Sequence, residues 1–570
     1  MFLPRAVHTD ALHAVSVAVA ARLSTGAVLH KDGQAFGGGK FFPIPLHEVL
    51  RDYFCNSKRF FLEEQFFSFE GEEKTDRMRK SFADRGSNVM NRWFETLQQT
   101  LDREKIPEDP KKAPLVPLQV YAESLGELRK AFSRWFLACL PANARIRVFV
   151  DGVAKRCYEG PTAEIDKDFQ ALLNEAGIPF RWTDLSASLA LPPGELHASH
   201  ECLERIRSVV REGEEDAAVV LGSGSITDLV KHALHLEGRH IPFVSIPTAL
   251  TVTAFTSAFA IIDFHGAKRT LQSRPVSAAF WVRPFLECAP PAMSRAGFGD
   301  LLARFVAYGD WFLGHRLGVM ERYDESAFRL MEPFAVGIRA AAGGFAGYPL
   351  PQDATACTAA ALAMAGISMS TAGETTPLSG FEHDISHALD FLRLTAGRDL
   401  VFHGEQVALG SLVSARTIDR LLAMENLKNV AWRDEDIEKS LRLLEERMAA
   451  APLPRGGDPY REKMGAALAE FSVEYRKKSE RWAAARPRIA TFVDSWGDIR
   501  LELARLTMRA GEMEPLLKKS GLPCRPGETD PPTADEEFRW AVAFSPFVRV
   551  RMNLSDLLFW MGREDLVVLP

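Results

Sequence analysis

Two histidine-containing segments near the middle of the chain carry side chains that could bind one divalent metal ion. The first segment contains His383 and the second contains His403. An upstream carboxylate, Asp300, could supply a third ligand. Three protein ligands with one open coordination position are typical of a catalytic metal site rather than a structural one. Two imidazoles and a carboxylate suit zinc, which we expect first, and also nickel or ferrous iron.

A third histidine, His387, follows His383 by four residues. On a helix this spacing places both imidazoles on one face, so that one could bind metal while the other faces a substrate. Hydride transfer to a ketone needs both functions, because a bound cation polarises the carbonyl and a histidine can move a proton. Any single histidine, however, is more often an ordinary packed or surface residue.

A glycine-containing turn could bind the phosphates of a dinucleotide. Gly222, Gly224 and Ser225 follow the apolar run Ala217–Leu221 and precede a predicted helix that begins near Ser225. Glycines allow a pyrophosphate to approach the backbone closely, and the start of a helix offers free N–H groups. The G-x-G-x-x-G pattern is incomplete, so an ordinary tight turn is an equal alternative.

Strands alternate with helices before residue 285 and give way to helices after it. The predicted strands are Arg145–Asp151, Ile178–Trp182, Ala217–Leu221 and Phe243–Ile246, and the predicted helices between them are Phe169–Ala176 and His200–Arg211. Later helical patterns cover 339–369, 405–424, 434–450 and 460–484. This order favours an α/β fold with a Rossmann-like parallel-sheet domain and a C-terminal all-helical domain.

We expect three parts in the chain. Residues 1–112 form an N-terminal extension of unknown role, with a helix at Ala11–Ala21 and a linker at 107–112. Residues 113–285 form the nucleotide-binding domain, and residues 286–570 form the helical metal-binding and catalytic domain.

Composition excludes some classes of partner. A net charge of -6 gives no basic surface for nucleic acid. The seven cysteines include no C-x-x-C pair, which favours reduced thiols and a cytoplasmic location. No apolar run approaches the roughly 18 residues of a membrane span.

Several segments together carry a family resemblance. They are GSGSITDLVK at 222–231, PFVSIPTA at 242–249, APPAMSRAGFGDLLAR at 289–304, SGFEHDISHALD at 379–390, HGEQVALG at 403–410 and VRVRMNL at 548–554. The chain resembles the glycerol-1-phosphate dehydrogenases, including their bacterial AraM-like branch. That family lies within the wider group of iron-containing alcohol dehydrogenases and dehydroquinate synthases, and the resemblance covers roughly residues 113–565.

The resemblance implies a dehydroquinate synthase-like fold with the active site between its two domains. It implies reduction of dihydroxyacetone phosphate to sn-glycerol 1-phosphate with NADH or NADPH, and a homodimer or larger homo-oligomer. The residues it implies for the cofactor are Gly222, Gly224, Ser225, Asp228, Thr248 and Ser257; for the metal Asp300, His383 and His403; and for substrate contact His387.

This chain departs from the family pattern at the substrate side. Thr253 stands where the family has an aspartate that contacts substrate, and threonine cannot act as a charged acceptor. Arg304 replaces a family lysine, which keeps the charge and alters its geometry. The segment Lys268–Thr270 could reach a substrate phosphate, but we expect it to be a solvated turn.

Three functions therefore compete. The first is a metal-dependent NAD(P)-linked dehydrogenase acting on a phosphorylated ketone or polyol, with Asp300, His387 and Thr253 at the reacting centre. The second is a lyase or cyclase that uses NAD and a divalent metal, as dehydroquinate synthase does. The third is a diverged, non-catalytic homologue, which the loss of the aspartate at Thr253 favours and the presence of all three metal ligands disfavours.

Overall fold

The computed structural model describes residues 91–106, 116–155, 164–347, 350–434, 436–453 and 458–570. All of these belong to one compact unit, Ser68–Pro570. The predicted helix at Ala11–Ala21 and the predicted linker at 107–112 lie outside the described residues.

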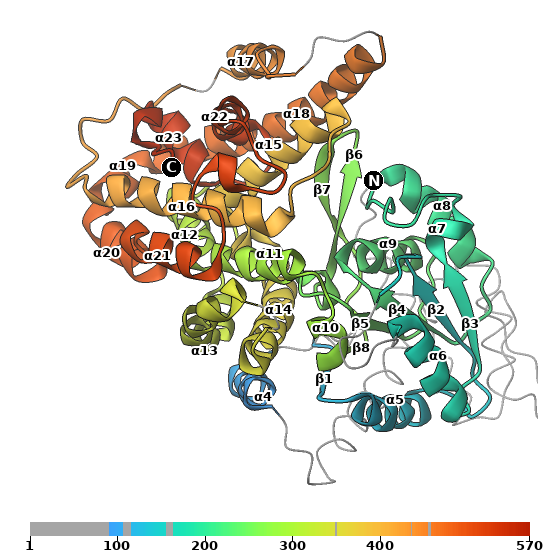
Figure 1. Cartoon of the computed structure of the whole chain (residues 1–570). Helices are drawn as coiled ribbons and strands as arrows, with labels where there is room; N and C mark the ends of the chain where they lie inside the picture. Colours follow the sequence, from blue (N-terminus) through green and yellow to red (C-terminus); the bar gives the residue numbers. More distant parts are fainter. Residues whose placement is uncertain (1–90, 107–115, 156–163, 348–349, 435, 454–457) are drawn as a thin grey trace, which may run out of the picture. The chain divides into compact units, whose positions relative to one another are not determined.

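Six parallel strands form the main sheet, in the order β1-β8-β5-β4-β2-β3 (Figure 1). The strands are β1 (Leu118–Ala122), β2 (Ile146–Val150), β3 (Phe180–Asp184), β4 (Ala217–Gly222), β5 (Phe243–Pro247) and β8 (Ala278–Val282). The predicted α/β architecture is therefore confirmed, and the four predicted strands correspond to β2 through β5.

Helices cover both faces of this sheet because its buried strands are apolar on both sides. Val148 of β2 faces one core and its neighbour Phe149 faces the other, as the alternation of a strand requires. The first core includes α5 (Leu125–Cys139) and α6 (Ile165–Glu175), and the second includes α8 (His200–Arg211) and α9 (Gly224–Leu236).

The sequence did not predict β1, β8 or the antiparallel hairpin of β6 (Phe259–Phe264) and β7 (Ala267–Gln272). Strand β1 is five residues long and mostly half-buried, so its apolar signal is weak. The hairpin turns at His265 and Gly266, which both have positive φ, as a two-residue turn requires. A His-Gly pair is a weaker turn signal than Asn-Gly.

Among the described residues, every regular element after β8 is helical. The α-helices are α10 (Arg283–Glu287), α11 (Pro291–Leu301), α12 (Ala307–Leu317), α13 (Glu325–Ala341), α14 (Gln352–Ala372), α15 (Phe381–Ala396), α16 (His403–Leu422), α17 (Ile437–Ala449), α18 (Asp458–Ala485), α19 (Ile489–Asp494), α20 (Trp496–Leu506), α21 (Ala510–Ser520), α22 (Asp535–Phe544) and α23 (Leu554–Met561). The single helix predicted at 339–369 is wrong, because Gly343-Gly344 and Pro351 divide it between α13 and α14.

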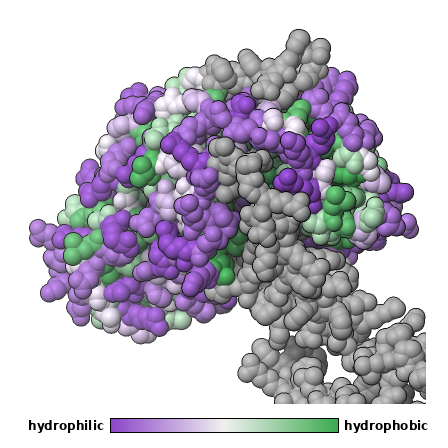
Figure 2. Space-filling model, turned by 90° about the horizontal axis from the view of Figure 1, so that it is seen from below, coloured by the Kyte–Doolittle hydropathy of each residue, from purple (hydrophilic) through white to green (hydrophobic). Residues whose placement is uncertain are grey.

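Helix α14 is long and apolar enough to cross a membrane, judged by length and composition alone. However, 94% of its apolar window is buried inside the protein, so this surface is used for packing. On the face seen in Figure 2, the described residues are mostly hydrophilic with small hydrophobic areas between them, as on a water-facing surface.

Helix α4 (Arg92–Glu104), from the predicted N-terminal extension, packs against α13 and α14. The indole N–H of Trp93 donates to Asp353 Oδ1 at 2.9 Å, and its ring lies 6.4 Å from that of Phe334. Phe94, on the same helix, is buried against Tyr121 of β1. At least this part of the extension therefore belongs to the packed structure.

Candidate metal and nucleotide site

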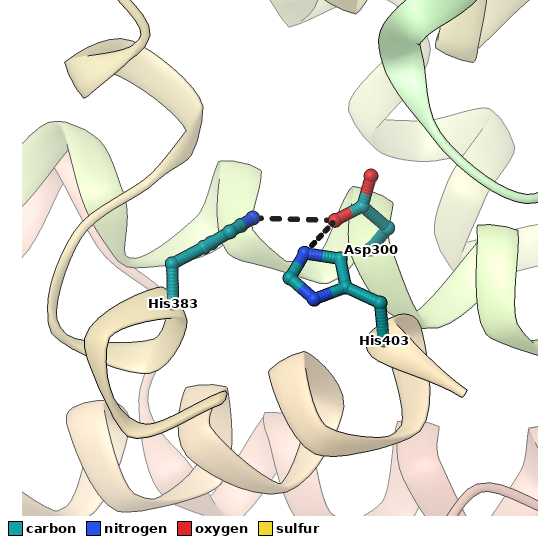
Figure 3. A group of neighbouring side chains, drawn as sticks. All are labelled: Asp300, His383 and His403. Atoms are coloured by element: carbon teal, nitrogen blue, oxygen red, sulfur yellow. Dashed lines mark ion pairs between the residues drawn. The ribbon is translucent and has the colours of Figure 1, made fainter. Parts of the chain in front are cut away.

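Asp300, His383 and His403 meet in space although they come from three helices (Figure 3). Asp300 lies near the end of α11, His383 in the first turn of α15, and His403 at the start of α16. The Nε2 atoms of His383 and His403 lie 3.3 and 3.7 Å from the same Oδ1 of Asp300. The three possible ligand atoms all lie within 4.8 Å of one another, close enough to share one cation.

The other ring nitrogen of each histidine has its own partner, as is usual for metal-binding imidazoles. Nδ1 of His383 lies 2.9 Å from Glu382 Oε1, and Nδ1 of His403 lies 2.9 Å from Ser386 Oγ. The hydroxyl of Ser386 donates to Gln406 Oε1 at 2.6 Å, so its oxygen is left to accept a hydrogen bond from the Nδ1–H of His403. Both Nε2 lone pairs can therefore face Asp300.

Burial alone would lower the pKa of His383, but the nearby carboxylates of Asp300 and Glu382 raise it to about 9. Its position thus favours a positive charge, either a proton on Nε2 or a metal ion in its place. Burial, followed by the charge of Lys268, holds the pKa of both His403 and His387 well below the ordinary value. These two imidazoles are neutral, as a ligand and a hydrogen-bonding group should be.

The residues present fit a divalent metal. Asp300 Oδ1 is buried and receives no hydrogen bond from the described residues, although both Nε2 atoms point towards it. A buried carboxylate oxygen without a donor is costly unless a cation satisfies it. Two imidazoles that can be neutral and a carboxylate form a set of three ligands, which leaves one coordination position open for substrate.

Glycines bring the backbones of the ligand-bearing helices into direct contact. A Cβ on Gly404 of α16 would overlap the carbonyl of Ala296 in α11, and a Cβ on Gly299 would overlap the carbonyl of Gly404. Such close approach needs residues without side chains. It fixes the separation of Asp300 from His403.

The three candidate ligands line a cavity of about 190 Å³ together with most of the predicted site. The predicted residues that line it are Gly224, Ser225, Asp228, Thr253, Ser257, Asp300, His383, His387 and His403. Gly222 and Thr248 are not in its lining; they lie side by side at the ends of β4 and β5, where the Thr248 N–H donates to the Gly222 carbonyl at 3.1 Å.

The glycine turn and the start of α9 are held by packing. A Cβ on Gly224 would overlap Val252, so packing alone requires a glycine at this position, whether or not a phosphate binds there. Asp228 accepts the N–H of Ile261 at 3.1 Å and pairs with Lys231 Nζ at 2.8 Å. Buried Lys231 also donates to the Ser257 carbonyl. These contacts attach the β6–β7 hairpin to α9, and a cofactor role for Asp228 stays a prediction.

His387 lies beside the metal-binding group. Its ring centroid is 6.4 Å from that of His383 and 5.8 Å from that of His403. Nη2 of Arg549 lies 2.5 and 2.9 Å from its two ring nitrogens. A guanidinium this close favours the neutral imidazole, which is suited to hydrogen bonding with a substrate.

Two cationic residues of the cavity were not assigned correctly from the sequence. Lys268 is on strand β7, not in a solvated turn, and it lines the cavity together with Thr270. Residues two apart on a strand share a face, whereas Arg269 between them points the other way, towards Glu470. Arg549 lies in the C-terminal segment 548–554, whose sequence alone indicates no role for it.

The two departures from the family pattern fall in different surroundings. Thr253 begins a 3₁₀ turn and lines the cavity, so it faces the space that a substrate would use. Arg304 is buried outside the cavity lining, with its guanidinium 5.2 Å from the ring of Phe305 and 4.7 Å from that of Phe328. Its replacement of lysine therefore concerns packing rather than substrate contact.

Residues 165–282 match a family model described as iron-containing alcohol dehydrogenase. A glycerol-1-phosphate dehydrogenase [NAD(P)+] from Bacillus velezensis is 30% identical over 282 residues, which cover 48% of this chain and 69% of that protein. The chain belongs to the glycerol-1-phosphate dehydrogenase family. Members of this family are NAD(P)-dependent dehydrogenases, and this chain has the corresponding parallel-sheet and helical architecture.

Other relatives match over a smaller share of their length. The glycerol-1-phosphate dehydrogenase of Pyrococcus furiosus is 33% identical over 215 residues, or 37% of this chain and 59% of that protein. Among solved structures, an alcohol dehydrogenase from Oenococcus oeni has a TM-score of 0.46 and 11% identity, covering 80% of this chain and 98% of that one.

Proposed function

We propose that this protein reduces dihydroxyacetone phosphate, or a closely related phosphorylated ketone, with NADH or NADPH and a divalent metal ion. The observation that supports this most is the common cavity of Asp300, His383 and His403 and the start of α9. A metal on the first three residues and a nicotinamide near Gly224 and Ser225 would then face the same substrate. The Bacillus velezensis relative carries the name of this activity.

Asp300, His383 and His403 would hold the metal, with zinc first and nickel or ferrous iron as alternatives. The metal would polarise the substrate carbonyl as a Lewis acid, and the reduced nicotinamide would supply the hydride. Glu382 and Ser386 orient the two imidazoles from their Nδ1 atoms. His387, held neutral by its surroundings, would hydrogen-bond a substrate hydroxyl and pass on a proton.

Gly222, Gly224, Ser225, Asp228, Thr248 and Ser257 would contact the dinucleotide, with the start of α9 offering N–H groups to its phosphates. In this proposal residues 113–285 are the nucleotide-binding domain and residues 286–570 the metal-binding domain. Thr253 would offer a hydroxyl to the substrate where relatives have a carboxylate. We therefore expect weaker hydrogen bonding to substrate hydroxyls at that position.

The test uses the full chain loaded with zinc, nickel or ferrous iron, mixed with dihydroxyacetone phosphate and NADH or NADPH. Oxidation of the nicotinamide, followed by absorbance, is the expected result. The variant His403→Ala should lose bound metal by elemental analysis, whereas His240→Ala, at an exposed histidine, should keep it. Unchanged metal content in His403→Ala would remove His403 from the site.

A lyase or cyclase reaction of the dehydroquinate synthase type is the second candidate, because it would use the same metal and nucleotide. In that reaction the nicotinamide is regenerated, so no net oxidation of NADH would occur. Binding of NADH without turnover over a panel of keto-phosphates would instead favour a non-catalytic homologue.

A further inference from the structure

Two cations line the cavity in addition to the candidate metal ligands and the nucleotide turn. They are Lys268 of β7 and Arg549 of the segment between α22 and α23. Their side chains are 16% and 8% exposed, so both are largely withdrawn from bulk water. Charges in such a position act more strongly than on an open surface.

The ammonium group of Lys268 has more hydrogen-bond donors than its contacts with the described residues use. Its Nζ lies 2.5 Å from Asp390 Oδ2, which is its hydrogen-bond partner within the described part of the chain. An ammonium group has three N–H donors, so two are available to a ligand. Asp390 also accepts from Gln406 at 3.1 Å, and this second contact holds the carboxylate in place when Lys268 turns to a ligand.

Arg549 also has a hydrogen-bond donor without a partner among the described residues. Its Nη1 donates to Ser379 Oγ at 2.8 Å and its Nη2 contacts His387, but its buried Nε has no hydrogen bond to any described residue. Asp384 Oδ1 lies 3.3 Å from this Nε, near enough to balance the charge. A guanidinium has five donors in a fixed fork, a shape suited to the oxygens of a phosphate.

We propose that Lys268 and Arg549 form an anion subsite that binds the phosphate group of the substrate, an inference that rests on the proposed function. Arg549 contacts His387, whose ring centroid lies 5.8 Å from that of His403. A three-carbon ketone phosphate with its carbonyl at Asp300 would therefore extend past His387 and place its phosphate between the two cations. Thr270, on the same face of β7, offers a hydroxyl beside them.

The first test compares dihydroxyacetone phosphate with dihydroxyacetone, which lacks the phosphate. Replacing Lys268 by Met, or Arg549 by Gln, should lower kcat/KM for the phosphorylated ketone by about 10- to 100-fold, the loss of a charge-assisted hydrogen bond. The value for dihydroxyacetone should fall less than that for the phosphorylated ketone, and the ratio of the two values is the readout because both side chains also influence His387. Arg269→Met, at the neighbouring residue outside the cavity, should match the wild type. An equal loss for both ketones would overturn the proposal.

A second measurement does not depend on turnover. Inorganic phosphate should bind the metal-loaded wild type and Arg269→Met, as followed by calorimetry, and should bind Lys268→Met and Arg549→Gln at least about 10-fold more weakly. If no ketone is reduced, the proposed function fails, while this phosphate result still supports or overturns the subsite. Equal phosphate affinity in all four proteins would overturn it.

The test is valid only if the variants keep the proposed metal site intact. Asp390 hydrogen-bonds both Lys268 and Gln406, and Gln406 accepts from Ser386, the partner of His403. Metal content by elemental analysis should stay unchanged in both cavity variants. Lys268→Arg, which keeps the charge, should recover most of the phosphate affinity. Failure of Lys268→Arg to bind phosphate better than Lys268→Met, with metal content intact in both, would count against a charge-based subsite.

Discussion

A buried ion pair between Lys478 and Asp556 holds the C-terminal segment that carries Arg549. Lys478 of α18 is fully buried, and its Nζ donates to the two oxygens of Asp556 at 2.9 and 3.0 Å. The same Nζ donates to the carbonyl of Pro546 at 2.7 Å. Asp556 in turn accepts the backbone N–H of Asn553 at 2.9 Å, where α23 begins. One lysine thus ties both flanks of residue 549 to α18.

Replacing Lys478 by Met should destabilise the fold by about 3–5 kcal/mol, since it leaves a buried carboxylate without its cation. Burial raises the pKa of Asp556 to about 7 even though Lys478 opposes the shift. This folded-state pKa lies above the unfolded value of about 3.9, so the carboxyl costs stability progressively as pH rises from about 4 to 7. Without Lys478 the cost should continue to grow above pH 7.

The adjacent residue gives a matched control. Lys477 pairs with Glu474 at 3.2 Å on an exposed face, so Lys477→Met should cost at most about 1 kcal/mol. Denaturant unfolding of both variants and the wild type at pH 7 provides the comparison. Adding Asp556→Leu to Lys478→Met should recover much of the loss. The reasoning is refuted if the two lysine variants unfold alike, or if the double variant is less stable than Lys478→Met alone.

Three further outcomes test other parts of the structure. Gly404→Ala should push α16 away from α11, lowering stability by about 1–3 kcal/mol and reducing metal content by displacing Asp300; a variant with normal metal binding would contradict the role of this contact. Ser386→Ala should weaken metal affinity about 10- to 100-fold by removing the partner of His403, measured by competition with a chelator. Hydrogen bonding to Arg211, followed by Arg207, lowers the pKa of Glu237 to about 2, so the stabilisation lost in Glu237→Gln should be present above about pH 4.5 and vanish as pH falls towards 2; a pH-independent difference in unfolding midpoint would exclude this.

Local sequence patterns predicted the strands β2 through β5 because each is a short, buried, apolar run in an alternating context. The grouping of Asp300, His383 and His403 was also readable, since these are chemically distinctive residue types in adjoining helical segments. Strands β1 and β7 escaped prediction for a physical reason: they are only partly buried, and their apolar alternation is weak.

Local sequence patterns could not predict which side chains from distant parts of the chain point into the same cavity. Lys268 was expected in a solvated turn because a Lys-Arg pair resembles an exposed loop, and only the strand alternation of β7 turns one of the two inwards. Arg549 reaches His387 across 162 residues of sequence, a contact that tertiary packing alone creates. Two arginines within the apolar run 548–554 were the available hint, because buried cations need partners.

The cavity draws its lining from His197 at one extreme of the chain order and Arg549 at the other. During synthesis, a polypeptide whose residues have emerged only as far as α22 would already have the metal ligands but not Arg549. Because Lys478 must also pair with Asp556 of α23, we expect the cavity to be completed only after α23 has left the ribosome. The growing chain should therefore bring the candidate metal ligands together before it completes the proposed phosphate subsite.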